Sequence, residues 1–141
     1  MNIYILIMTT PTLLTAFNDH FMEFVNDIHE VFPDDVDILS AKNSFSMVRK
    51  MNPKLLIKSW DSLVVGKYQS AIEAGDLSFF MNKDYTSDLK DVPNNPNAER
   101  IVSAIDRLRT PIKSMSSDNQ AKIIKYIQNL TKISNLYNMT Q

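Results

Sequence analysis

A chain of 141 residues with 44% apolar and 22% charged residues has the length and composition of one ordinary soluble domain, which argues against a disordered chain or a membrane protein. The chain has no cysteine, which excludes disulfides, thiolate metal sites and a cysteine nucleophile, and which suits a reducing compartment. Its two glycines, Gly66 and Gly75, are too few for most β-rich folds or phosphate-binding loops, so the composition favours helices.

The first ten residues, MNIYILIMTT, contain an unbroken apolar run. The run is too short to span a membrane, and it lacks the basic residues and the length of a signal peptide. Its β-branched and aromatic residues favour an extended strand, although the rest of the chain offers no sheet. We interpret residues 1–11 as an extended apolar arm that packs along its own bundle or docks on a neighbouring subunit, and a third interpretation takes Met8 as the natural start. The candidate partner-binding residues of the arm are Ile3, Tyr4, Ile5, Leu6, Ile7 and Met8.

Two helices are predicted after the arm, over residues 12–32 and from about residue 36 to 51. Thr12 is the expected N-cap of the first helix, and Pro33 should end it because proline disfavours a helical conformation at the residue before it. An N-cap at Asp34 or Asp35 should start the second. The first apolar stripe consists of Phe17, Phe21, Phe24, Ile28 and Val31, and the second helix carries Ile38, Leu39, Phe45, Val48 and Met51.

A third helix is predicted over residues 53–74, with Asn52 as its cap, Pro53 at its first position and Gly75 as its end. Its inner face should bury Trp60. Residues 76–89 predict one short helical turn, and the run DVPNNPN at residues 91–97 predicts a turn or tether, because proline and asparagine favour irregular backbone.

Two further helices are predicted beyond this break. Thr110-Pro111 should kink or split the first of them, and the pattern Ser117-x-x-Gln120 predicts a capping box at the start of the second. The sequence therefore predicts an all-α protein, an irregular bundle of about five helices with a short extended N-terminal arm. Its predicted parts are the arm at 1–11, a main helical bundle at 12–89, a Pro/Asn-rich linker at 90–97 and a C-terminal helical hairpin at 98–141, packed on the bundle or on a partner.

The net charge of −1 hides a segregation of charge along the chain. Residues 1–41 contain seven acids and no Lys or Arg, whereas residues 42–72 contain six bases and one acid. Helical geometry places four acids of the first helix on one side, away from the phenylalanines. We call these residues, Asp19, Glu23, Asp27 and Glu30, the acidic ridge, and three interpretations stay open: a solvated face, a surface for a basic partner, or a carboxylate metal site.

Two basic clusters accompany the acidic ridge. The basic corner consists of Arg49, Lys50, Lys54 and Lys58 around Asn52-Pro53, and the lysine row consists of Lys122, Lys125 and Lys132 on one face of the last helix, together with Asn129. Exposed ion pairs contribute little stability, so steering of partner subunits is the better use of these charges. Nucleic-acid binding is disfavoured, because only Tyr126 is interleaved with the lysine row.

Catalytic and metal-binding motifs are not evident in the sequence. His20 and His29 are nine residues apart, which puts them on opposite faces of one helix, where they cannot share a metal. Asp34-Asp35-x-Asp37 lacks the glycine and the closing glutamate of a calcium loop. There is no P-loop, dinucleotide fingerprint or nucleophile elbow, so we expect no enzyme activity, no cofactor and no metal.

Three segments carry a resemblance to a known group of proteins: the phenylalanine-rich first helix through VFPDD, the segment MVRKMNPKLLIK, and GDLSFFMNKDY. Through them residues 13–89 resemble a small helical protein of large nucleocytoplasmic DNA viruses, notably those of algae and protists. The resemblance implies a viral protein and a minor component of the virion, present in the host cytoplasm during assembly.

We therefore expect a non-enzymatic structural or assembly protein, a minor capsid component that belongs to a larger complex and bridges other capsid subunits. The alternative is a helical regulatory or host-interaction adaptor that binds nucleic acid or acts on replication or transcription proteins.

Overall fold

The computed structural model describes residues 9–82 and 96–141, and the predicted apolar arm Ile3–Met8 and most of the predicted linker lie outside this part. All regular elements in the described ranges are helices, so the predicted all-α bundle is confirmed. In chain order they are α2 (Thr10–Val31), α3 (Val36–Met51), α4 (Leu55–Trp60), the π-helical turn η1 (Asp61–Val65), α5 (Gly66–Glu73), α6 (Ser78–Asn82), α7 (Pro96–Lys113) and α8 (Ser117–Met139).

The ends of α2 and α3 follow from local chemistry. Thr9, and not the predicted Thr12, caps α2: the backbone N–H of Thr12 donates to the Thr9 hydroxyl at 3.3 Å. The expected end is confirmed, since Phe32 is the C-cap directly before Pro33. Asp35 caps α3 by accepting hydrogen bonds from two backbone N–H groups, as one of the two predicted caps should.

The predicted helix at 53–74 is divided into α4, η1 and α5. Asn52 is the C-cap of α3 and not the N-cap of the next helix, which begins after Lys54. The wide turn of η1 brings the Asp61 carbonyl to within 3.2 Å of where a Cβ at position 66 would lie, which favours glycine there. Gly75 ends the segment with φ at +73°, a conformation that only glycine adopts readily.

Helices α7 and α8 meet in a tight, capped turn. Helix α7 continues through Pro111, which occupies its last turn, so the predicted split does not occur. The predicted capping box is wrong: Ser116 caps α8, and the Gln120 side chain instead donates to the Ile112 and Lys113 carbonyls at 3.1 and 3.4 Å. Gln120 thus satisfies carbonyl groups that the end of α7 leaves without helical partners.

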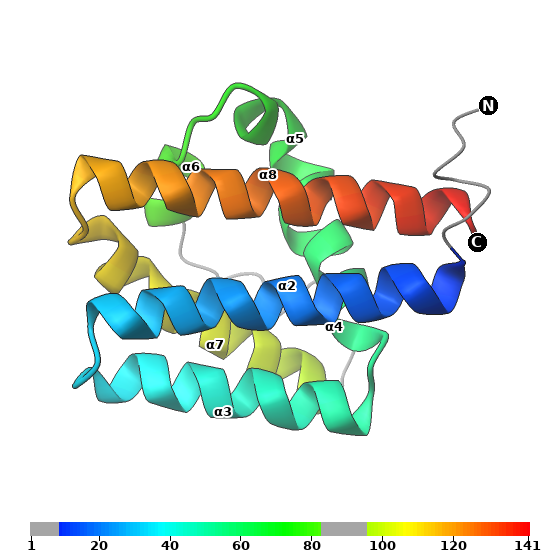
Figure 1. The fold of residues 1–141 in the computed structure, drawn as a ribbon, viewed down its shortest axis with the longest axis horizontal. Helices are drawn as coiled ribbons and strands as arrows, with labels where there is room; N and C mark the ends of the chain where they lie inside the picture. The colour runs from blue at the N-terminus through cyan, green and yellow to red at the C-terminus, as the bar shows by residue number, and fades with distance from the viewer. Residues whose placement is uncertain (1–8, 83–95) are drawn as a thin grey trace.

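Helices α3, α2 and α8 lie side by side in one layer, with α2 in the middle and antiparallel to both neighbours (Figure 1). Behind this layer α7 packs mainly on α3, and α4, η1 and α5 contact α8. A hydrogen bond of 2.8 Å between the Thr10 and Thr140 hydroxyls joins the start of α2 to the end of α8. The predicted division of the chain into a main bundle and a C-terminal hairpin, with a linker at residues 90–97, stays a prediction.

The hydrophobic core joins residues from all of these helices in one cluster. At its centre Phe21 packs edge-on against Phe45 of α3 and Trp60 of α4, with ring centroids at 4.7 and 6.0 Å. The indole N–H of Trp60 donates to the Thr131 hydroxyl of α8 at 3.3 Å. Aromatic packing on α2 therefore fixes the positions of the flanking helices.

Candidate functional site

The acidic ridge lies along the outer side of α2, as the sequence predicted, and its four carboxylates are exposed. The lysine row lies on the neighbouring helix α8, with Lys122, Lys125 and Lys132 exposed as well. The structure therefore brings together two predicted sets of charge that are about one hundred residues apart in the chain. They form the two walls of a shallow groove between α2 and α8.

The walls of this groove are in register. Glu30 and Asp27 face Lys122 across one part of the groove, and Asp19 and Glu23 face Lys132 across another. Within residues 9–82 and 96–141 no ion pair of 4.0 Å or less links the acidic ridge to the lysine row. The two walls therefore do not neutralise each other by direct ion pairs.

Tyr126 of α8 lies between the two walls, and its hydroxyl donates a hydrogen bond to the Asp27 carboxylate. Burial of the phenol, followed by this hydrogen bond, raises the pKa of Tyr126 to about 12. The charges of Glu23 and Glu30 act in the same direction, as expected when the acidic ridge dominates the local field.

His20 completes the floor of the groove. Its ring packs on that of Tyr126 with centroids 4.9 Å apart, and its Nδ1 lies 3.4 Å from the Glu23 carboxylate. The buried His20 Nε2 atom has no hydrogen-bond partner among the described residues. Sequence analysis placed Tyr126 among the lysine row, since it lies one helical turn from both Lys122 and Asn129, but it did not identify His20 as part of this surface.

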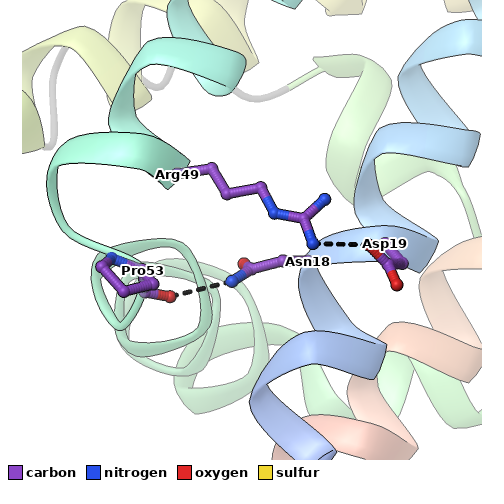
Figure 2. Close-up of polar contacts among 4 residues, drawn as sticks. All are labelled: Asn18, Asp19, Arg49 and Pro53. Carbon is purple, nitrogen blue, oxygen red and sulfur yellow. Dashed lines mark hydrogen bonds and ion pairs between the residues drawn. The ribbon is translucent and has the colours of Figure 1, made fainter.

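The basic corner is only partly free (Figure 2). Arg49 of α3 turns toward α2 and pairs with Asp19 at 2.5 Å, and beside it the buried Asn18 amide donates to the Pro53 carbonyl at 3.0 Å. These two contacts hold the turn after α3 against α2. The other members of the corner, Lys50, Lys54 and Lys58, are exposed.

The outer side of α3 carries an apolar row that sequence analysis did not identify as a surface. Val36 and Met51 are 76% and 62% exposed, and Leu39 and Met47 are both 44% exposed. Val31, which the α2 stripe was expected to bury, is also exposed at the adjacent end of α2. The apolar character of these residues does not by itself distinguish a core position from an interaction surface.

Residues 9–82 and 96–141 hold no group of three or more His, Cys, Asp or Glu placed to bind a metal ion. No helix in the same ranges has the length and apolarity needed to cross a membrane.

No family model, curated protein sequence or solved structure matches the chain significantly. The resemblance to viral proteins therefore stays a prediction.

Proposed function

We propose that the protein is a non-enzymatic component of a larger assembly, a minor capsid protein of the virion that bridges other capsid subunits. The observation that carries the proposal is the apolar row on the outer side of α3, formed by Val36, Leu39, Met47 and Met51. Single exposed apolar side chains are normal on a protein surface, whereas a row on one helix face is typical of a protein contact.

The row consists of two pairs on one side of α3, Val36 with Leu39 and Met47 with Met51, and the exposed Asn43 lies between the pairs. At 100° per residue its four side chains fall within an arc of about 120° on α3, and two of them are methionines, which adapt to an uneven partner surface. Burying such a side chain fully contributes about 1.5–3 kcal/mol before ordering costs, so four of them support a specific contact.

The charges beside the row define the partner chemistry. Lys50 is exposed in the last turn of α3 next to Met51, and Lys54 and Lys58 are exposed in the following turn and in α4. They complement a partner with an apolar groove and an acidic rim, because opposite charges at the rim of an interface speed association and reject wrong partners. We therefore assign the α3 surface to a capsid subunit with such a groove.

Photocrosslinking during assembly tests this assignment. A photoreactive amino acid replaces Val36 in the virally expressed protein, and a matched variant carries it at the exposed Ser70 of α5. We expect a covalent adduct with a capsid protein from position 36 and none from position 70, together with a fixed copy number of the protein in purified particles.

Two results contradict the proposal. One is absence of the protein from purified particles. The other is an adduct from position 36 to a replication or transcription protein, which would instead support the helical adaptor.

A further inference from the structure

Two rows of opposite charge lie parallel on the α2–α8 face. At a rise of 1.5 Å per residue, the acidic ridge extends about 16 Å from Asp19 to Glu30, and the lysine row extends about 15 Å from Lys122 to Lys132. The rows thus have nearly equal length, and both consist of exposed side chains.

The register of the two rows is fixed by the residues that line the groove. Glu30 and Asp27 line one part of the groove with Lys122, and Asp19 and Glu23 lie on either side of the level of Lys132 in another part. No ion pair links these two rows to each other within residues 9–82 and 96–141, and of the acidic ridge Asp19 is paired elsewhere in the subunit, with Arg49 of α3.

A twofold axis along the groove makes this face complementary to itself. Rotation by 180° about such an axis keeps each residue at its level along the groove and places α2 of one copy over α8 of the other. Glu30 of each copy then faces Lys122 of the other, and Lys132 lies between Asp19 and Glu23 of the other copy. An axis across the helices would instead place α2 over α2 and bring like charges together, so the charge pattern selects one orientation.

We propose that the α2–α8 face is the contact surface of a symmetric dimer of this chain, in which each acidic ridge lies over the lysine row of the second copy. The proposal rests on the α2–α8 groove alone and is independent of the function assigned to α3. Tyr126 and His20 lie between the two rows and supply aromatic area to this face.

Sedimentation analysis of the full chain tests the dimer. We expect a concentration-dependent dimer in about 50 mM NaCl and a dissociation constant at least about tenfold higher in about 500 mM NaCl, because salt screens exposed charges. A wild-type chain that stays monomeric at low salt and at a protein concentration of about 100 μM overturns the proposal.

Charge-swapped variants test the predicted orientation. The acid variant carries Glu23→Lys and Glu30→Lys, and the lysine variant carries Lys122→Glu and Lys132→Glu. Alone, each variant opposes like charges at all four swapped contacts and should dimerise at least about tenfold more weakly than the wild type. An equimolar mixture restores opposite charges at every contact and should recover the wild-type dimer, which also shows that both variants are folded.

A matched control separates this surface from a general effect of charge. Lys54→Glu with Lys58→Glu changes the net charge as much as the lysine variant does, but it acts on the basic corner, away from the groove. It should dimerise like the wild type. Loss of the dimer in this control, or failure of the mixture to recover it, overturns the proposal.

Discussion

Two contacts hold the turn after α3 against α2: a hydrogen bond from a buried side chain and an exposed ion pair. The hydrogen bond from the buried side chain should contribute more to the stability of the protein than the ion pair. Asn18 and Arg49 lie side by side and both hold this turn (Figure 2). Asn18 is 2% exposed, whereas the side chains of Arg49 and Asp19 are 31% and 62% exposed. We expect Asn18→Ala to destabilise the protein more than Arg49→Ala.

The magnitudes follow from burial. Asn18→Ala removes a buried donor, leaves the Pro53 carbonyl without this partner and opens space in the core edge, which should cost about 1–2 kcal/mol. Arg49→Ala removes an exposed ion pair, which should cost less than about 1 kcal/mol. For a chain of this size, about 1 kcal/mol shifts the melting temperature by about 4 °C, so the expected decreases are about 4–8 °C and less than about 4 °C.

Urea unfolding and thermal melting at low and high salt measure this order. The cost of Arg49→Ala should shrink in about 0.5 M NaCl, while that of Asn18→Ala should not change. Lys50→Ala, an exposed neighbour in the same corner, is the matched control and should stay within about 0.5 kcal/mol of the wild type. An equal or larger loss in Arg49→Ala, or a salt-independent one, would refute the reasoning.

Three further predictions concern the core, the groove and the cap. Phe21→Ala empties the centre of the aromatic cluster and should lower the free energy of unfolding by about 3–5 kcal/mol in urea titrations, and a loss below about 1 kcal/mol would contradict this packing. In the folded protein the pKa of the Tyr126 phenol is raised to about 12 from its ordinary value of 10.0. The contribution of the phenol to the free energy of unfolding is therefore complete below about pH 10 and is lost as the pH rises through about 12. The difference in stability between wild type and Tyr126→Phe should therefore decrease from about pH 8 to about pH 11, and a constant difference would show that the phenol titrates normally. Gln120→Ala removes the cap of α7 and should cost about 1 kcal/mol, whereas the exposed Ala121→Ser should cost less than about 0.5 kcal/mol in the same melting experiment.

The sequence predicted the features that depend on local chemistry. The alternating steps of four and three identified the buried stripe of α2, because residues on one helix face follow from geometry alone. Asp35 and Pro33 marked the adjoining helix ends, since a side-chain cap and a missing donor act within a few residues. The acidic ridge and the lysine row were each found in the same way.

The remaining features depend on contacts between distant segments. Neither row of charge indicates which helix lies beside it, so the groove became visible only when α8 was found packed on α2. The division of the predicted third helix also escaped sequence analysis, because the wide turn before Gly66 forms among η1 residues that pack in the core. Leu39 and Met51 were grouped with Ile38, Phe45 and Val48 by residue type, but burial depends on whether another element covers that face of α3.

The proposed dimer and the proposed α3 contact are compatible, and together they explain how so small a chain would bridge larger subunits. In the layer of three helices α8 lies on one side of α2 and α3 on the other (Figure 1). A twofold axis along the α2–α8 groove therefore places the two α3 helices at opposite edges of the dimer, with both apolar rows facing outward. One dimer could then hold two capsid subunits, whereas a monomer could hold only one through this surface. The charge-swapped variants should accordingly keep the photocrosslink from position 36 when expressed alone but lose native complexes that hold two such adducts, and the mixture of variants should restore these complexes.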